Sequence, residues 1–280
     1  MNRKPIRIAI STCPNDTFAF HGLLTKAVDD RGLDFQFDLL DIQQLNDRMF
    51  SGNFDIAKGS YHAALLLADA CYVLPSGSAL GFGVGPLLLA AEDQSHPQPG
   101  ERQLTLCPGK STTAALLYRL FYAECGRMEH VVFSEIMPRL RLKQADFGVC
   151  IHEGRFTYQQ EGLTLVEDLG TRWEQTTNCP LPLGGIFANR KLDADTIGRA
   201  QMAIRDSIEF AISDPDAALP TMRTYAQEFN DEVLMQHVHL YVNSWTQDLG
   251  EQGRQAVDCL SQLAASAGVI PQTNPLEIFR

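Results

Sequence analysis

No stretch of this sequence is apolar for long enough to cross a bilayer, and no apolar leader stands at its start. A membrane-spanning helix needs about 20 mostly apolar residues, and no window of the 280-residue chain contains such a run. Met1–Pro5 lead directly into the apolar segment Ile6–Ile10, without the longer apolar region and small-residue cleavage site of a secretory signal. We therefore expect no membrane insertion and a cytoplasmic location.

Paired cysteines and clusters of basic residues are also missing. The seven cysteines are odd in number and show no paired spacing, which suits a reducing compartment better than a disulfide framework. The formal net charge is −11 and no Lys/Arg cluster stands out. No nucleic-acid partner is expected, because phosphate binding relies on a basic surface. A small anionic molecule can still bind through local hydrogen-bond donors.

The composition is otherwise that of a globular protein with a large core. Hydrophobic residues make up 45% of the chain and charged residues 20%, which argues against disorder. A single domain typically has about 100 to 200 residues. A chain of 280 residues therefore predicts two lobes.

Short apolar runs alternate with helical patterns, which predicts an α/β fold. Strands are expected at residues 6–10, 34–40, 54–57, 71–74, 87–91, 103–106, 131–133, 145–151, 163–166 and 180–188. Helices are expected at 18–28 (capped by Asn15 or Asp16), 45–50, 62–70, 114–124, 138–143, 196–212 (capped by Asp193 or Asp195), after Asp214, after a cap at Asp231, and at 251–265.

The order of these elements predicts how the lobes are divided. We expect a large, discontinuous α/β lobe from residues 1–91 and 178–280 and a small α/β lobe from residues 92–177, joined by two crossings that form a hinge. Each lobe has a strand, a polar turn and a helix, and later an Asp-led strand, at Asp55–Ser60 in one and Asp146–Glu153 in the other. This pattern suggests two related lobes that face each other. The helices after residue 190 are expected to pack onto the large lobe.

Four polar turns, at residues 11–17, 58–61, 107–113 and 152–158, are expected to point into the cleft between the lobes. His152 stands out because it follows the apolar strand at 145–151. Ligands of open α/β sheets bind outside the carboxyl ends of the strands, and histidine is the readiest acid or base near neutral pH. The alternative is a structural histidine with its hydrogen bonds satisfied.

Two further turn positions are candidates for binding an anion. Thr112 and Thr113 begin a helix, where free backbone N–H groups favour a carboxylate and two hydroxyls add donors. The alternative is ordinary threonine capping. Arg155 can clamp an anion, or it can simply pair with a carboxylate such as Glu153 or Glu161.

Nucleotide motifs are incomplete. Gly109–Ser111 resembles the end of a phosphate loop, but Leu104 stands where that motif needs glycine. Gly81, Gly83 and Gly85 have the wrong spacing for a dinucleotide site, and a strand rather than a helix follows them. We expect these three glycines to relieve crowding near the hinge.

No metal site is predicted. His152–Glu153 lacks the second histidine of a zinc protease, and His237 and His239 are two apart in a helix, so they face apart. Cys13, Cys107 and Cys150 lie at or near strand ends, where a cysteine can act as a nucleophile. The favoured interpretation is that they are small buried side chains.

Six segments together resemble the 1,4-dihydroxy-6-naphthoate synthase family, the lyases of the futalosine route to menaquinone. They run nearly from end to end of the chain: Cys13–Phe18, Lys58–Tyr61, Gly109–Ala114, Ile151–Tyr158, Leu181–Gly184 and His237–Asn243. The resemblance implies a two-lobed fold similar to type II periplasmic binding proteins, with a small carboxylate substrate closed between the lobes. It also implies conversion of cyclic dehypoxanthine futalosine to 1,4-dihydroxy-6-naphthoate, with release of dihydroxyacetone and without a cofactor.

The same resemblance assigns residues to roles. His152 corresponds to the family's proton acceptor, and the substrate-binding segments correspond to Lys58, Gly59 and Ser60 and to Thr112 and Thr113. Contacts are also expected from the turn formed by Asn15, Asp16 and Thr17, and from Arg155. Two alternatives remain open: a chorismate dehydratase, which shares the fold and weaker forms of some motifs, and a non-catalytic solute-binding protein for small carboxylates.

Overall fold

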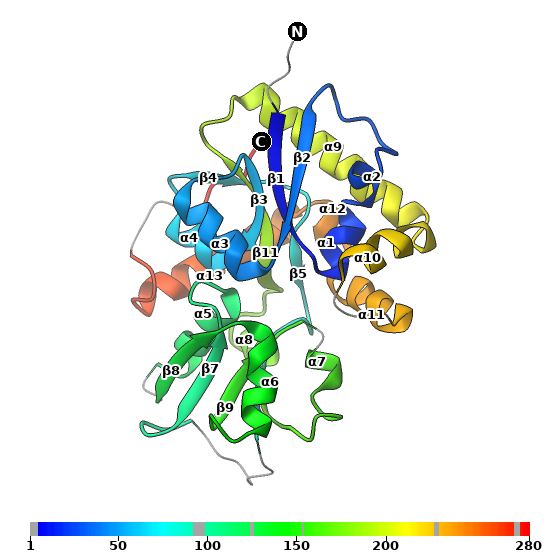
Figure 1. The fold of residues 1–280 in the computed structure, drawn as a ribbon. Helices are drawn as coiled ribbons and strands as arrows, with labels where there is room; N and C mark the ends of the chain where they lie inside the picture. Colours follow the sequence, from blue (N-terminus) through cyan, green and yellow to red (C-terminus); the bar gives the residue numbers. More distant parts are fainter. Residues whose placement is uncertain (1–4, 92–98, 124–125, 153, 227–229, 272–274) are drawn as a thin grey trace.

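Two mixed β-sheets with helices packed around them form the two lobes of the computed structural model (Figure 1). The structure describes residues 5–91, 99–123, 126–152, 154–226, 230–271 and 275–280. The two-lobed α/β architecture predicted from the sequence is confirmed.

The first sheet contains the first strands of the chain and one late strand that returns to it. Its strands are β1 (Pro5–Ser11), β2 (Asp34–Leu40), β3 (Ile56–Ser60), β4 (Cys71–Val73), β5 (Ala79–Gly81) and β11 (Leu181–Asn189). The order is β2-β1-β3-β11-β4, and β5 also pairs with β11. β1 runs parallel to β2 and β3, whereas β11 is antiparallel to β3, β4 and β5.

The second sheet has the same plan. Its strands are β6 (Leu87–Ala90), β7 (Leu104–Pro108), β8 (Arg127–Val131), β9 (Phe147–Cys150) and β10 (Thr164–Asp168), in the order β10-β6-β9-β7-β8. β7 is parallel to β8 and β9, and β6 is antiparallel to β9 and β10. In both sheets, therefore, an antiparallel strand is inserted next to three parallel ones.

The predicted internal similarity extends to individual hydrogen bonds. The backbone N–H of Arg7, early in β1, donates to the Asp55 carboxylate at 2.9 Å, and the N–H of Leu104, at the start of β7, donates to the Asp146 carboxylate at 2.7 Å. Each aspartate lies just before the next parallel strand, β3 or β9. The two lobes are thus built alike, as the matching Asp-led strands predicted.

One part of the predicted division is wrong. The sequence pattern predicts residues 87–91 in the large lobe, but β6 pairs with β9 and β10 in the second sheet. All four residues of β6 are buried. A short, uniformly apolar strand carries no sequence signal for the sheet it joins, because such runs occur in any strand that is covered on both faces.

The helices are α1 (Pro14–Ala19), α2 (His21–Leu24), α3 (Ile42–Ser51), α4 (Tyr61–Leu66), α5 (Thr113–Phe121), α6 (Phe133–Arg141), α7 (Gly154–Thr157), α8 (Leu169–Thr177), α9 (Ala194–Ser213), α10 (Leu219–Tyr225), α11 (Asp231–Tyr241), α12 (Ser244–Gln247) and α13 (Gly250–Ser266), with a 3₁₀ turn at Asp216–Ala218. The predicted cap Asp193 is confirmed, since it accepts from the Thr196 N–H. The predicted caps Asn15 or Asp16 and Asp231 are wrong: Cys13 and Asn230 hold those positions.

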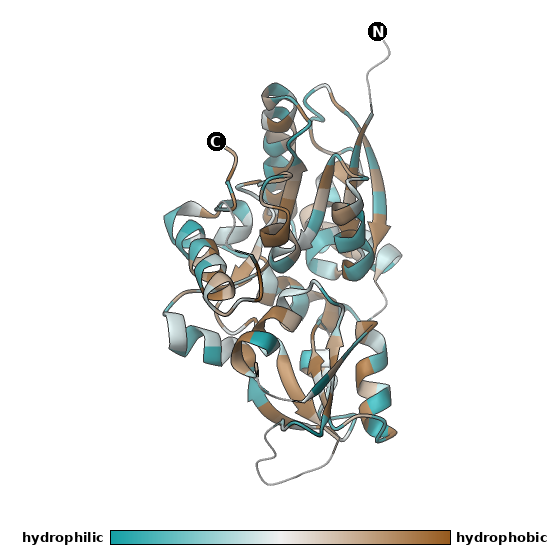
Figure 2. Cartoon of the chain, turned by 90° about the vertical axis from the view of Figure 1, so that its left-hand side faces the viewer, coloured by the Kyte–Doolittle hydropathy of each residue, from teal (hydrophilic) through white to brown (hydrophobic). Residues whose placement is uncertain are grey.

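The late helices pack mainly onto the large lobe, as predicted. Ile197, Ile204 and Ile208 of α9 share a buried cluster with Ile8 and Ile10 of β1, and α10 and α11 contact α1. Figure 2 shows helices whose colour alternates between apolar and polar positions, as expected for helices covered on one side. Among the described residues, none of the helices has both the length and the apolar character that a membrane crossing requires.

Candidate active site

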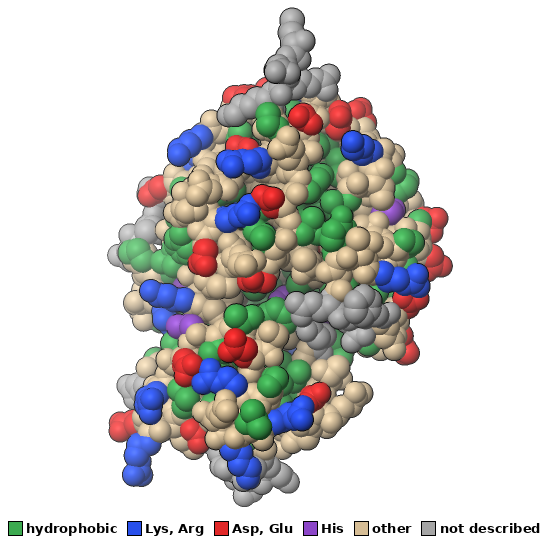
Figure 3. All heavy atoms as spheres, in the orientation of Figure 1, with side chains coloured by type: hydrophobic (Ala, Val, Ile, Leu, Met, Phe, Trp, Pro, Cys, Tyr) green, Lys and Arg blue, Asp and Glu red, His purple; other side chains and the backbone are tan. Residues whose placement is uncertain are grey.

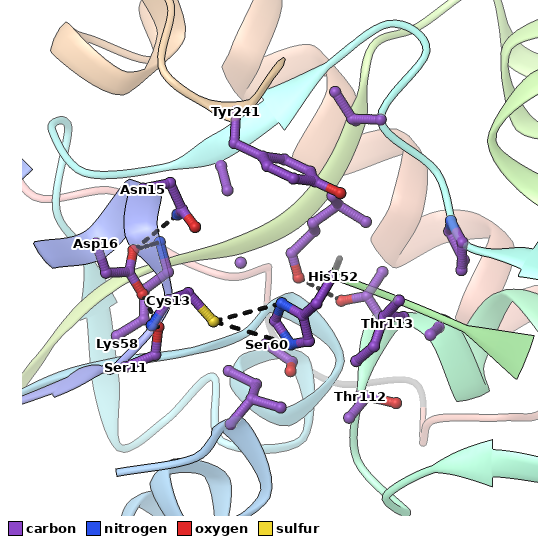
Figure 4. Close-up of a pocket in the computed structure, with 18 of the residues that line it drawn as sticks. Ser11, Cys13, Asn15, Asp16, Lys58, Ser60, Thr112, Thr113, His152 and Tyr241 are labelled. Carbon is purple, nitrogen blue, oxygen red and sulfur yellow. Dashed lines mark hydrogen bonds and ion pairs between the residues drawn. The ribbon is translucent and has the colours of Figure 1, made fainter. Parts of the chain in front are cut away.

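A cavity of about 740 Å³, partly open to solvent, lies between the two lobes. The large lobe contributes Ser11, Cys13, Asn15, Asp16, Lys58 and Ser60 to its wall, and the small lobe contributes Thr112, Thr113, His152 and Arg155. All four polar turns predicted from the sequence therefore meet at one cavity (Figure 4).

His152 lies two residues beyond the end of β9, at the edge where the sequence placed it. Its backbone has φ of 57°, the left-handed region that residues other than glycine seldom adopt. Such conformations persist where the surrounding structure fixes them, often at functional sites. The imidazole Nδ1 lies 3.3 Å from the Cys13 thiol sulfur (Figure 4). On its other sides the ring contacts Phe133 edge-on and stacks on His237, with centroids 4.8 and 6.3 Å away.

A buried ion pair forms the polar end of the cavity in the large lobe. Lys58 Nζ lies 2.8 Å from Asp16 Oδ1, and the side chains are 6% and 5% exposed. Asp16 also accepts hydrogen bonds from the Ser11 hydroxyl and the Asn15 amide, while Lys58 donates to the Gly77 carbonyl. Because buried charges are tolerated only when paired and hydrogen-bonded, this network fixes the geometry of the wall.

Two residues predicted to contact substrate do not line the cavity. The Thr17 hydroxyl is buried and donates to the carbonyls of Cys13 and Pro14. Side chains alternate between the faces of a strand, so in β3 Lys58 and Ser60 face the cavity and Gly59 faces the other way. A Cβ at Gly59 would lie 2.2 Å from the Met49 sulfur.

The structure shows the capping role of Thr112, and binding of an anion at Thr112 and Thr113 remains a prediction. Thr112 is the N-cap of α5, and its hydroxyl accepts from the Ala115 N–H. The Thr113 hydroxyl donates to the Leu183 carbonyl at 2.6 Å. Both residues also border the cavity. The capping role is thus observed, and the backbone N–H groups of Thr113 and Ala114, two residues that border the cavity, have no helical carbonyl to bind.

Arg155 pairs with a carboxylate that the sequence analysis did not name, Asp168. One guanidinium nitrogen donates to Asp168 at 2.7 Å and another donates to the Gly85 carbonyl. Glu161 pairs with a different arginine, and Glu153 lies outside the described residues. Arg155 also borders the cavity, and its role in binding remains a prediction.

The three candidate cysteines have different surroundings. Cys107 and Cys150 are buried, and burial raises the pKa of the Cys107 thiol to about 12. Both fit the interpretation of small core side chains. Cys13 instead lies in the cavity beside His152.

Sequence reasoning missed Asn46, which positions Ser60. The Asn46 side chain is fully buried, accepts from the Ser60 N–H at 2.9 Å and donates to the Ser60 hydroxyl at 3.1 Å. It also donates to the Ser111 carbonyl of the small lobe. A polar residue between the buried Leu45 and Met49 of α3 was the available signal. The apolar part of the cavity wall was also missed; it includes Ile42, Val84, Leu183 and Tyr241.

The prediction that glycines relieve crowding near the hinge is confirmed in part. A Cβ at Gly85 would lie 2.1 Å from Gly170 Cα, so crowding does require glycine there, whereas Gly83 has a positive φ of 70° and open space around it.

The two histidines of α11 face apart, as predicted. His237 is buried and His239 is exposed. Within the described residues no cluster of three or more typical ligand side chains is placed to hold a metal.

We expect the free energy of unfolding to decrease as pH falls from about 6.5 to about 4. Burial lowers the pKa of His62 to about 4 and that of His237 to about 3, from an ordinary value of 6.5. The unfolded chain then binds more protons than the folded chain in this window, so stability rises with pH and this contribution is complete above about pH 6.5. For His62, whose pKa falls from 6.5 to about 4, the change corresponds to about 3 kcal/mol.

Urea unfolding at several pH values would measure this dependence. His62 Nδ1–H donates to the Thr112 carbonyl at 3.1 Å. His62→Gln keeps a donor but cannot titrate, so its free energy of unfolding should depend less steeply on pH than that of the wild type. Equal slopes would contradict the assignment of His62.

Sequence comparisons agree along nearly the whole chain. The model of a family described as menaquinone biosynthesis matches residues 6–266. A 1,4-dihydroxy-6-naphthoate synthase of Streptomyces coelicolor is 40% identical over 281 aligned positions, which cover 98% of this chain and 98% of that protein. One from Thermus thermophilus is 39% identical and covers 97% of this chain and 98% of its own length.

Solved structures of other proteins share the fold of this chain, which confirms the predicted periplasmic-binding-protein-like architecture. Protein AF1704 from Archaeoglobus fulgidus superimposes with a TM-score of 0.89 at 30% identity, over 95% of this chain and 98% of that one. The alkanesulfonate-binding protein SsuA from Xanthomonas axonopodis, solved with MOPS, superimposes with a TM-score of 0.73 at 12% identity, over 99% and 98%. The second likeness establishes fold alone. The sequence matches over nearly the full length show common ancestry. The chain belongs to the menaquinone-biosynthesis family that includes the 1,4-dihydroxy-6-naphthoate synthases.

Proposed function

We propose that this protein is a carbon–carbon lyase that converts cyclic dehypoxanthine futalosine to 1,4-dihydroxy-6-naphthoate and dihydroxyacetone. The observation that carries the proposal is the position of the His152 imidazole, which shares one cavity with a helix N-terminus at Thr112 and Thr113 and with Ser60. The names of the relatives from Streptomyces and Thermus support the product.

The ring carboxylate of the substrate would bind at the start of α5. This helix has nine residues, and the N–H groups of its first turn have no helical carbonyl to bind. With the helix dipole they favour an anion. The nearby cations Lys58 and Arg155 are each already paired with an aspartate, so the helix is the better candidate for a carboxylate.

The sugar-derived part of the substrate would bind at the other end of the cavity. Asn15 and Asp16 line that end and supply amide and carboxylate groups for the substrate's hydroxyls (Figure 4). Ser60 lies nearer α5, since Asn46 donates both to its hydroxyl and to the Ser111 carbonyl, and it adds a hydroxyl group. The Lys58–Asp16 pair and Asn46 hold these groups in place. The apolar residues Ile42 and Leu183 would contact the ring system.

In this proposal, His152 is the proton acceptor. A neutral imidazole removes a proton from the bound substrate, the carbon–carbon bond to the three-carbon fragment then breaks, and the ring becomes aromatic. Cleavage with transfer of a proton involves no net oxidation, so no redox cofactor or metal is required. The protein supplies positioning, a base and exclusion of water. The Cys13 thiol, which contacts Nδ1, helps to orient the ring.

The direct test incubates the purified protein with cyclic dehypoxanthine futalosine and, in parallel, with chorismate. Mass spectrometry of the first reaction should detect the naphthoate and dihydroxyacetone in equal amounts, and chorismate should be recovered unchanged. Dehydration of chorismate alone would identify the protein as a chorismate dehydratase. Binding without conversion of either compound would indicate a solute-binding protein.

A further inference from the structure

A second hollow lies behind His152. It measures about 520 Å³ including its open side, and Cys13, Ile42 and His152 line both this hollow and the main cavity. The additional wall comes from residues of the Ser11–Pro14 segment, from α6 and from α11, among them Thr12, Phe133 and His237. The imidazole and the thiol therefore separate two neighbouring compartments.

His237 is the polar group of the second compartment that lacks an explanation. Its side chain is 2% exposed, and neither ring nitrogen has a hydrogen-bond partner among the described residues. An unsatisfied buried polar group is costly and calls for a specific reason. A bound molecule that pairs with these nitrogens provides one. Tyr241, one turn further along α11, borders the main cavity, so the helix borders both compartments.

The chemistry of the wall restricts the occupant. Burial lowers the pKa of His237 to about 3, so near neutral pH the ring is uncharged and offers one donor and one acceptor. No lysine or arginine is among the described residues that line the compartment, and its acidic residue, Asp41, caps α3 by accepting from the N–H groups of Gln43 and Gln44. An anion finds no cation there. A hydroxyl group, which both donates and accepts, matches a neutral histidine.

We propose that this second compartment binds a small neutral hydroxylated molecule, with His237 as its hydrogen-bonding residue. Its identity rests on the proposed function: the three-carbon hydroxyketone released by carbon–carbon cleavage has this chemistry and is formed beside His152. The main cavity then retains the aromatic carboxylate. After cleavage the fragment leaves the polar groups of the main cavity for the second compartment, and the two products then lie on either side of the imidazole.

Binding of dihydroxyacetone, measured by saturation-transfer NMR, tests the proposal. We expect dihydroxyacetone to bind in the millimolar range to wild-type protein that is already saturated with 1,4-dihydroxy-6-naphthoate. His237→Phe should weaken this binding at least tenfold and leave naphthoate binding unchanged. His237→Gln, which restores a donor and an acceptor, should recover part of it. His239→Phe is the matched control, since His239 is exposed on the same helix, and it should change nothing.

Two results would contradict the proposal that the second compartment binds dihydroxyacetone through His237. One is displacement of dihydroxyacetone by naphthoate, and the other is equal binding to the wild type and to His237→Phe. Thermal unfolding should show that His237→Phe is at least as stable as the wild type, because the substitution removes unsatisfied polar atoms; if this variant does not fold, His237→Gln and the wild type decide. Failure of the wild type to cleave the futalosine-derived substrate would refute the proposed function alone, because binding of dihydroxyacetone is measured without turnover.

Discussion

Replacement of His152 by alanine is expected to lower kcat for naphthoate formation by about 100- to 10,000-fold, the range that general base catalysis contributes. The imidazole lies at the junction of the polar turns, next to the compartment proposed for the released fragment. The carboxylate and hydroxyl contacts proposed for the substrate do not involve it. The substrate dissociation constant, measured by calorimetry, should therefore change by less than about threefold, because the interaction acts mainly in the transition state.

A second variant separates loss of the base from disturbance of the backbone. His152 has a positive φ, a conformation that asparagine adopts more readily than alanine. His152→Asn should keep the turn and still be inactive. Turnover close to that of the wild type in either variant would remove His152 from the mechanism.

Lys58→Met is expected to lower the free energy of unfolding by about 3 to 5 kcal/mol, the cost of leaving one member of a buried ion pair without its partner. Asp16 would retain hydrogen bonds from Ser11 and Asn15, but its charge would be buried without a cation. The double variant Lys58→Met/Asp16→Asn removes both charges and should recover part of the loss. Urea unfolding at neutral pH measures all three proteins.

An exposed ion pair offers a matched control. Arg223 pairs with Asp231, and their side chains are 48% and 45% exposed. Arg223→Met should lower the free energy of unfolding much less than Lys58→Met does, because solvent screens exposed pairs. If Lys58→Met were as mild as Arg223→Met, the ion pair would not be what holds this wall of the cavity together.

The surface charge is consistent with a small ligand held in the interior. Figure 3 shows acidic and basic side chains interspersed over the visible face rather than gathered by sign. The charges that the cavity wall contains are paired locally, as in Lys58–Asp16 and Arg155–Asp168. Recognition in the proposed site would thus depend on hydrogen-bond donors and a helix terminus more than on net charge.

The spacing of apolar residues and the polar turns between apolar runs were sufficient to predict the order of strands and helices. Apolar runs ended by polar turns predicted the strands, and parallel strands bring their carboxyl ends to one edge, so the meeting of the four turns followed from local pattern. Helix boundaries were less accurate: the helix expected at 18–28 begins at Pro14 and is interrupted at Phe20. Cys13 takes the cap position, and the Asp16 carboxylate instead pairs with Lys58.

By itself the sequence determined the α/β class, the two related lobes and the place of His152, because these depend on the spacing of residues along the chain. Only the tertiary structure decided which sheet receives β6, that Gly59 and Thr17 face away from the cavity, and that Arg155 pairs with Asp168. It also brought His237 against His152, across 85 residues of sequence. These features depend on which surfaces meet in space, and contacts between distant segments leave no local periodicity from which they could be predicted.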